Sequence, residues 1–324
     1  MKSAQKEYLP SFEQNISFLA PQNLDDTSEW FASNIGDIRK SLEEYGVVLV
    51  RGAPIQGMKK LEKLLSTIFE DSLLDYLYRT SPRTNLRGHI YSSTEYHSDN
   101  YISLHNESSY FTSWPMNIAF YCAKAAKNGG ATPIVDSRLI YQAIPNEIRE
   151  EFEAKNLKYV RNFIDIDLPW KDVFQTNKRK EVESFCRHHN LQFEWTGNDN
   201  LRTVNTQRPA FFHPKTGEKT WFNQAHLFHF STYPLAERQQ LVDSIGYKNL
   251  PKNVFFADDS EIPEEYIQII SQVYREHAFR FQWEDGDLLL LDNMLFAHGR
   301  DPFEGARKVL VGMANSISTA EMKS

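Results

Sequence analysis

The sequence predicts a mainly β fold with helical insertions, in which short strands form a jelly-roll core, or double-stranded β-helix. Two observations indicate the fold: short apolar segments recur along the chain, and amphipathic segments with helical spacing interrupt them. A third fits it, because aromatic residues make up 13% of the chain, which suits a roomy barrel interior. The sequence contains no internal repeat or linker, so we expect one domain over residues 1–324.

The first part of the chain predicts a helix, a strand and a second helix. Apolar residues at helical spacing predict a helix over 30–45, and Gly46 would end it. Residues 47–52 form an apolar run that we expect to be a buried strand, and residues 58–69 again have helical spacing. Residues 1–28 are polar and contain two prolines, so we expect them to wrap the surface.

Strands and helices are both expected after residue 110. Turn residues such as Asn128-Gly129-Gly130 separate the segments. The expected strands are residues 118–123, 131–136, 157–163, 193–195, 201–206, 210–213, 219–223, 280–283, 288–291 and 308–314, and the expected helices are residues 137–153, 170–190, 235–245 and 263–278. Residues 76–110 fit no amphipathic helix and are rich in polar residues and tyrosine, which is typical of a functional loop.

Composition excludes several classes of function. The net charge is -7 and the pI is about 5.8, without the basic stripe that a nucleic-acid partner would need. The longest apolar run, residues 118–123, is far too short to span a membrane, and the N-terminus lacks the apolar region of a secretory signal. Cys122 and Cys186 form no disulfide framework, so we expect buried thiols in a reducing cytoplasm.

The strongest chemical signal is the pair His105 and Glu107. They are two residues apart, which is the period of a strand, so their side chains would leave the same face. His298 is the best third ligand. Two histidines and one carboxylate on one face of an iron ion leave positions open for a cosubstrate and O2. A second pair, His97 and Asp99, has the same spacing, and spacing alone does not choose between the pairs.

Six stretches carry a resemblance to a known family. They are Tyr-Ser-Ser-Thr-Glu-Tyr at 91–96, Leu-His-Asn-Glu at 104–107, Trp-Pro at 114–115, Gly-Gly-Ala-Thr-Pro at 129–133, Trp-Phe-Asn-Gln-Ala at 221–225, and His-Gly-Arg-Asp-Pro-Phe at 298–303. In these stretches the chain resembles the taurine dioxygenase / clavaminate synthase-like family of Fe(II)- and 2-oxoglutarate-dependent oxygenases. It is most similar to the branch with the syringomycin-type amino-acid hydroxylases.

The resemblance implies His105, Glu107 and His298 as ligands of Fe(II), with O2 and 2-oxoglutarate as cosubstrates. It implies that Thr132 and Arg307 bind the far carboxylate of 2-oxoglutarate. An arginine suits this role because it offers a bidentate fork and keeps its charge when buried.

The resemblance also bears on the rival pair and on the chemistry. It places His97 and Asp99 in a loop near the pocket mouth. Halogenating relatives replace the acidic ligand by a small residue, so Glu107 argues against halogenation. Taurine dioxygenases carry a substrate-binding arginine where this chain has Val311, which puts a sulfonate substrate in doubt.

The branch implies hydroxylation of an unactivated C–H bond of an amino acid, or of an amino-acid-derived compound, in natural-product biosynthesis. The substrate would be free or attached to a carrier protein, and desaturation, epoxidation or cyclisation are alternative outcomes. We expect substrate contacts from four residues: Arg79, Asn106, Trp221 and Asn223. A surface ion pair is the alternative for Arg79, and core packing is the alternative for Trp221. Tyr110 and His226 are expected to line the same pocket.

Two other classes of protein compete with the oxygenase. A cupin-like isomerase or hydrolase with Zn or Mn would keep the metal but would not need Thr132 and Arg307. A non-catalytic barrel would have lost at least one metal ligand, whereas all three candidates are present.

Overall fold

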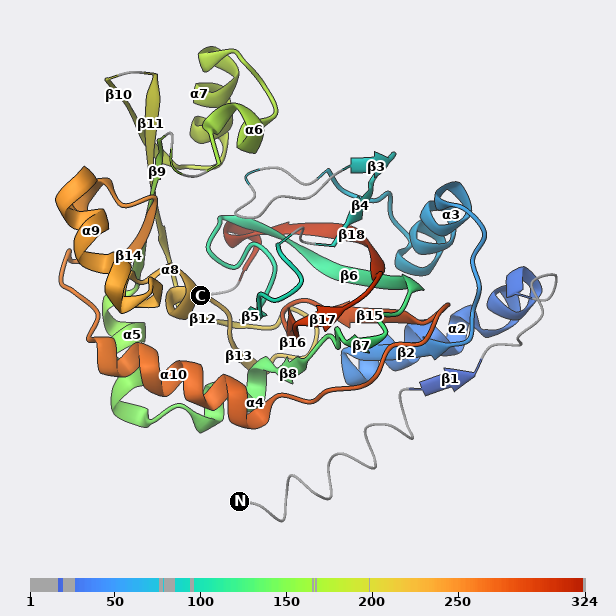
Figure 1. Cartoon of the computed structure of the whole chain (residues 1–324). Helices are drawn as coiled ribbons and strands as arrows, with labels where there is room; N and C mark the ends of the chain where they lie inside the picture. The colour runs from blue at the N-terminus through green and yellow to red at the C-terminus, as the bar shows by residue number, and fades with distance from the viewer. Residues whose placement is uncertain are drawn as a thin grey trace.

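The structure, a computed structural model, describes residues 27–75, 78, 85–93, 96–164, 166, 168–197 and 199–322, and the backbone of Ser17–Leu19. Its main sheet has seven strands, in the order β1 (Ser17–Leu19), β2 (Val47–Arg51), β15 (Leu288–Asp292), β6 (Ser113–Lys124), β18 (Lys308–Ser318), β4 (Ile90–Ser92) and β3 (Asn85–Arg87). A second sheet has β5 (Ile102–His105), β16 (Phe296–Arg300) and β8 (Ile134–Asp136). One hydrophobic cluster joins residues of both sheets, which therefore face each other as the two layers of a jelly roll (Figure 1).

The main sheet is apolar on both faces because both faces are covered. Leu289 and Leu291 of β15 belong to the cluster between the two sheets. Leu288 and Leu290 belong to a second cluster, formed with the helices α2 (Thr27–Tyr45) and α3 (Met58–Phe69). Side chains alternate between the faces of a strand, so four consecutive leucines are what a strand buried on both faces requires.

A third sheet lies beside the jelly roll. Its strands are β10 (Gln192–Thr196), β11 (Asn200–Gln207), β9 (Leu157–Phe163) and β14 (Lys252–Phe256), in that order. Two small two-stranded sheets pair β12 (Ala210–Phe212) with β13 (Lys219–Trp221), and β17 (Phe303–Glu304) with β7 (Asn128–Gly129). The remaining helices are α4 (Ser137–Ala143), α5 (Asn146–Lys155), α6 (Trp170–Phe174), α7 (Arg179–His188), α8 (Ala225–Phe228), α9 (Leu235–Ile245) and α10 (Glu264–His277), with 3-10 turns η1 (Phe230–Thr232), η2 (Tyr247–Asn249) and η3 (Thr319–Glu321). The third sheet and helices α4, α5, α6, α7 and α10 share the largest hydrophobic cluster.

Most of the expected elements are present, and four expectations are wrong. Residues 76–110, expected to be a loop, include the short strands β3, β4 and β5. The helix expected over 137–153 is two helices, because Pro145 lacks the N–H that a helix interior needs and instead opens α5. The helix expected over 170–190 is interrupted where Gln175 adopts a left-handed conformation with φ 52°. Residues 280–283 alternate in burial like a strand, but within the described residues the only β-bridge beside them pairs Ile134 with Phe279.

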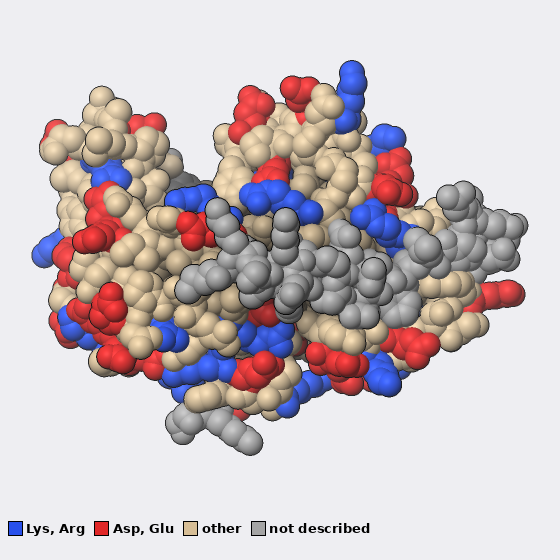
Figure 2. All heavy atoms as spheres, turned by 90° about the horizontal axis from the view of Figure 1, so that it is seen from below, with Lys and Arg blue, Asp and Glu red and all other residues tan. Residues whose placement is uncertain are grey.

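The surface carries charges of both signs. Figure 2 shows Lys and Arg side chains mixed with Asp and Glu side chains on the face seen from below. Of the helices that the structure describes, none has the length and apolar character needed to cross a membrane. Both cysteines are buried and unpaired, as expected, and burial raises the pKa of each thiol to about 12.

Candidate metal centre and adjoining pocket

Three side chains meet between the two layers of the jelly roll. His105, Glu107 and His298 each offer one ligand atom, and these atoms lie within 4.8 Å of one another. In the described part of the chain no other group of three such residues meets this criterion. Glu107 and His298 are each only 3% exposed. Two imidazoles and one carboxylate at this separation form a donor set that suits a divalent transition metal.

Strand pairing places the two histidines. β5 and β16 are antiparallel, and His105 stands directly opposite His298 in their register. Opposite residues of an antiparallel pair project from the same face, and the two ring centroids are 4.7 Å apart. Residues that are 193 positions apart in the sequence thereby become neighbours. β8 pairs with β16 on its other side, so the strand that carries His298 is held from both edges.

Glu107 lies outside strand β5, so the period of a strand does not explain how it reaches the metal site. β5 ends at His105, and Glu107 lies in the turn that follows. The expectation that both side chains project from one strand is therefore wrong, although the two residues do meet. The turn brings the carboxylate towards the two imidazoles.

The orientation of His105 is fixed by its own strand. The Nδ1 atom lies 2.8 Å from the carbonyl oxygen of Ser103. A carbonyl can only accept, so Nδ1 carries the hydrogen and donates it. This leaves the Nε2 lone pair for a metal, which is the usual arrangement of a metal-binding histidine.

A pocket extends from the two histidines to Arg307 at the start of β18. Its lining residues are Ser93, Ile102, His105, Phe120, Thr132, His298, Gly299, Arg300, Arg307 and Val309. It therefore joins the candidate metal site to both residues that the sequence assigns to 2-oxoglutarate.

Arg307 is a partly buried cation without a carboxylate partner among the described residues. Its Nε atom donates to the carbonyl oxygen of Gly130 at 3.0 Å, and longer contacts of 3.5 Å join its other nitrogens to Ser93 Oγ and Thr132 Oγ1. Burial, and to a smaller degree the charge of Arg300, lower the pKa of Arg307 to about 10. A carboxylate bound in the pocket would supply the missing counter-charge.

Thr132 is prepared to donate a hydrogen bond into the pocket. The indole nitrogen of Trp283 donates to Thr132 Oγ1 at 2.9 Å. With its acceptor side occupied, the hydroxyl hydrogen is directed elsewhere. Thr132 and Arg307 could therefore both donate to one carboxylate, which is the role that the family resemblance implies for them.

Arg300 fastens a loop at the edge of the pocket. Its guanidinium donates to the carbonyl oxygens of Tyr96, His97 and Asn100, at 3.0, 2.7 and 2.9 Å. The rival pair lies in this loop: the side chains of His97 and Asp99 are 74% and 81% exposed, and neither belongs to the buried donor group.

Three residues that the sequence assigns to substrate binding have structural contacts instead. Asn106, Trp221 and Asn223 are fully buried. Trp221 lies in the largest hydrophobic cluster, which was the alternative for this residue. The side chain of Asn223 donates to Pro209 O and accepts from Ala225 N, so both ends of its amide are used within the protein. Arg79 lies outside the described residues.

Two other expected pocket residues also serve the scaffold. His226 Nε2 donates to the carbonyl oxygen of Leu104, next to His105, at 2.9 Å, and its ring stacks on Tyr274. Burial lowers the pKa of His226 to about 4. The hydroxyl of Tyr110 donates to the carbonyl oxygen of Tyr78.

Sequence reasoning missed the contributions of Ser93, Trp283, Arg300 and Asn293. Arg300 stands in the stretch His-Gly-Arg-Asp-Pro-Phe, so its motif was visible but its role was not. Asn293 was visible as a polar residue at the end of a leucine run, where a strand should turn.

Comparisons with known proteins identify the family of this chain. A family model described as "Taurine catabolism dioxygenase TauD, TfdA family" matches residues 7–314. Dapdiamide synthesis protein DdaC of Enterobacter agglomerans is 34% identical over 310 residues, which cover 95% of this chain and 94% of that protein. A clavaminate synthase-like protein of Arabidopsis thaliana is 28% identical over 284 residues, which cover 84% of this chain and 82% of the relative.

A solved structure gives the same picture of the fold. The crystal structure of an asparagine oxygenase in complex with Fe(II), a 3-hydroxyasparagine and succinate aligns with a TM-score of 0.55 over 90% of this chain and 82% of that chain, at 9% identity. The likeness supports the predicted jelly-roll fold. The family match covers most of the chain and confirms the expected class of enzyme, a dioxygenase that uses Fe(II) and 2-oxoglutarate. The chain belongs to the TauD/TfdA family.

Proposed function

We propose that this protein hydroxylates an unactivated C–H bond of an amino acid, or of an amino-acid-derived compound, in natural-product biosynthesis. The observation that carries the proposal is one pocket with two chemically different ends. Three metal donors lie at one end, and a partly buried arginine without a carboxylate partner among the described residues lies at the other.

In this proposal His105, Glu107 and His298 hold Fe(II), and Arg307 and Thr132 hold the far carboxylate of 2-oxoglutarate. Bound iron and 2-oxoglutarate supply the oxidising chemistry. The protein's own residues orient the cosubstrate and keep the pocket dry. Phe120 and Val309 give the pocket apolar walls beside the histidines, and Trp283 orients the Thr132 hydroxyl.

The substrate class is supported by relatives. One of them is named for the synthesis of dapdiamide and covers nearly the whole chain, and the asparagine oxygenase was solved with a hydroxylated amino acid. Val311 lies in the core between the sheets, which supports the sequence argument against a sulfonate substrate. Arg79 remains our candidate for a substrate carboxylate. The proposal includes both a free substrate and one attached to a carrier protein. The buried thiols support a cytoplasmic location.

The first test is anaerobic. We expect the weak visible charge-transfer band of an Fe(II)–2-oxoglutarate chelate when both are added to metal-free protein. The His298→Ala variant should show no band. A correctly folded wild-type protein without the band would contradict the proposal.

The second test identifies the substrate. Amino acids are offered first free and then as thioesters on a carrier protein, and succinate release is measured with the mass of the product. A gain of one oxygen atom indicates hydroxylation or epoxidation, which the NMR spectrum of the product distinguishes, whereas a loss of two hydrogens indicates desaturation or cyclisation. Succinate release that no amino acid or amino-acid derivative increases would contradict the proposed substrate class.

A further inference from the structure

Asn293 lies in the turn between β15 and β16, five residues before His298, and its side chain is completely buried. Its amide group binds both sides of Glu107. The Oδ1 atom accepts from the Glu107 backbone N–H at 2.7 Å, and Nδ2 donates to the Glu107 carbonyl oxygen at 2.9 Å. The same nitrogen donates to Pro115 O at 2.8 Å.

The hydrogen bonds from Asn293 take the place of the backbone bonds that a neighbouring strand would make to Glu107. β5 ends at His105, so the peptide groups of Glu107 have no strand neighbour to pair with. Buried peptide groups need partners, and the amide of Asn293 supplies a donor and an acceptor in the arrangement that a strand would offer. The residue that supplies the carboxylate donor is thereby tied to the turn that leads into β16, the strand that carries His298.

The backbone of Asn293 is fixed as well. Its N–H donates to Met116 O at 2.7 Å, and its carbonyl oxygen accepts from Asn106 Nδ2 at 2.7 Å. Asn106 also donates to Ser137 Oγ, and its own carbonyl oxygen accepts from Gln224. Asn106, which precedes Glu107, and Asn293, which binds the Glu107 backbone, therefore belong to one buried hydrogen-bond network.

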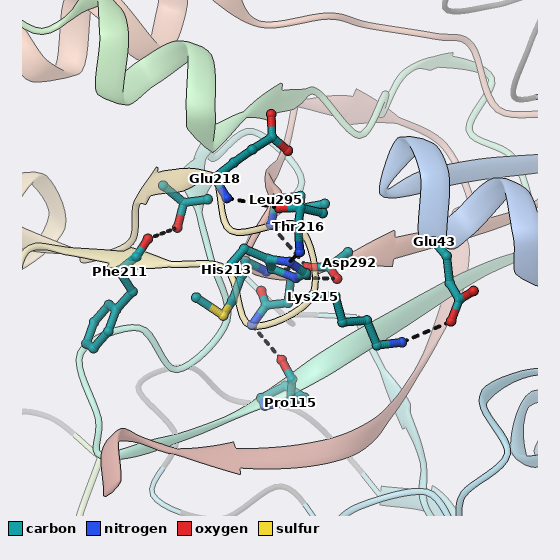
Figure 3. A network of polar contacts seen from close by, with 12 residues as sticks. Glu43, Pro115, Phe211, His213, Lys215, Thr216, Glu218, Asp292 and Leu295 are labelled. Carbon is teal, nitrogen blue, oxygen red and sulfur yellow. Dashed lines mark hydrogen bonds and ion pairs between the residues drawn. The ribbon is translucent and has the colours of Figure 1, made fainter. Parts of the chain in front are cut away.

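Asp292 and His213 hold the same turn from its other side. Asp292 Oδ1 accepts from the backbone N–H groups of Met294 and Leu295, and Oδ2 accepts from His213 Nε2 at 3.0 Å. The Nδ1 atom of His213 accepts from Thr216 N, so the histidine fits this place as its neutral Nε2–H form. Figure 3 shows His213 and Asp292 side by side, with Pro115 across the turn from them.

We propose that Asn293 is a positioning residue that sets the place of Glu107 relative to His298, and so the affinity of the site for its metal. The inference rests on the proposed function, because it concerns the same metal centre. Residues behind the ligands of a metal site commonly change its affinity about 10- to 100-fold when they are mutated. A purely structural role would instead lower stability and leave metal affinity unchanged.

Asn253 provides a matched control. It is 3% exposed, lies on β14 of the third sheet, and uses its amide in a similar way. Its Oδ1 atom accepts from Phe230 N at 2.9 Å, and its Nδ2 atom donates to Tyr247 Oη at 3.0 Å. Asn293→Ala and Asn253→Ala both remove a buried amide, but only the first removes the brace on Glu107.

The experiment is an anaerobic titration of metal-free protein with Co(II), followed by the visible absorption of the bound ion and by the rise in Tm. We expect Asn293→Ala to bind Co(II) about 10- to 100-fold more weakly than the wild type. Asn253→Ala should bind it within about twofold of the wild type, because distant sites act independently.

Asp292→Asn is the second variant in case Asn293→Ala does not fold. It keeps an oxygen for the two backbone N–H groups but removes the acceptor for His213, so we expect Co(II) binding weakened by less than in Asn293→Ala. A Co(II) affinity equal to that of the wild type in a folded Asn293→Ala or Asp292→Asn protein would overturn the positioning role of Asn293. The proposed function would not be affected. A folded wild type that binds no Co(II) would overturn the proposed function first, and with it this inference.

Discussion

The two ends of the pocket are built in opposite ways. At the metal end, every element that carries a donor is held by short bonds: His105 by Ser103, the backbone of Glu107 by Asn293, and β16 by strands on both sides. At the other end, Arg307 makes one bond of 3.0 Å and two contacts of 3.5 Å.

The difference indicates how each end binds. A metal gains affinity from donors that are already in place, because little has to be ordered when it binds. A partly buried arginine with weak contacts gains a strong partner only when a carboxylate binds. We therefore interpret the metal end as preorganised and the arginine end as completed by the cosubstrate, so changes at the two ends should separate metal affinity from cosubstrate affinity.

The largest effect should follow loss of a metal ligand. His105→Ala removes one of three donors, and we expect both turnover and the Fe(II)–2-oxoglutarate band to fall to background. The fold should survive, because His105 lies at the end of β5. Circular dichroism and the anaerobic spectrum measure the two properties. A folded variant that kept the band would show that His105 is not a ligand.

Loss of Arg307 should weaken 2-oxoglutarate binding and leave metal binding unchanged. Removing one partner of a hydrogen-bonded charge pair inside a pocket costs about 2–5 kcal/mol, so Arg307→Ala should weaken 2-oxoglutarate binding roughly 30- to 5,000-fold. Co(II) affinity should stay near that of the wild type. Arg307→Lys keeps the charge but loses the bidentate fork, so its affinity for 2-oxoglutarate should lie between those of the wild type and Arg307→Ala. An equal loss of metal affinity in Arg307→Ala would mean that the two ends are not separable.

A single added methyl group can probe each end. A Cβ at Gly299 would lie 2.5 Å from the carbonyl oxygen of Ile102, so Gly299→Ala should push β5 and β16 apart and weaken metal binding about tenfold. A Cβ at Gly130 would lie 3.0 Å from Arg307 Cδ, and the residue has a φ of 69°. Gly130→Ala should therefore weaken 2-oxoglutarate binding instead. Paired titrations with Co(II) and with 2-oxoglutarate measure both variants, and the same pattern in both would contradict the comparison.

The sequence was informative where one residue type suffices for a role. Runs such as the four leucines of β15 predict a strand buried on both faces, and two histidines with a carboxylate predict a metal site. It was less informative where a role depends on a partner distant in the chain. Nothing near Asn293 or Trp283 in the sequence indicates that the first binds the backbone of Glu107, or that the second binds Thr132. The contacts of Asn106 could not be foreseen for the same reason, because its partners Ser137 and Asn293 come from remote elements.

Trp283 allows the smallest change at the arginine end. Trp283→Phe keeps an aromatic ring in the core but removes the N–H that donates to Thr132 Oγ1. The freed hydroxyl can then rotate and spend part of its time directed away from the pocket. A hydrogen bond contributes about 0.5–1.5 kcal/mol, so we expect 2-oxoglutarate binding weakened roughly 2- to 10-fold.

The matched control for this change is Trp195→Phe. The indole of Trp195 donates to Glu183 Oε1 at 3.1 Å, beside the third sheet, and it contacts nothing that lines the pocket. This variant should lose a similar hydrogen bond and bind 2-oxoglutarate as the wild type does. If Trp283→Phe also bound it normally while Arg307→Ala did not, the arginine alone would hold the carboxylate, and Thr132 would serve only to pack against Trp283. Weaker 2-oxoglutarate binding in Trp283→Phe, with normal binding in Trp195→Phe, would instead show that the arginine end contains one preorganised donor. That donor is the Thr132 hydroxyl, which the Trp283 indole orients.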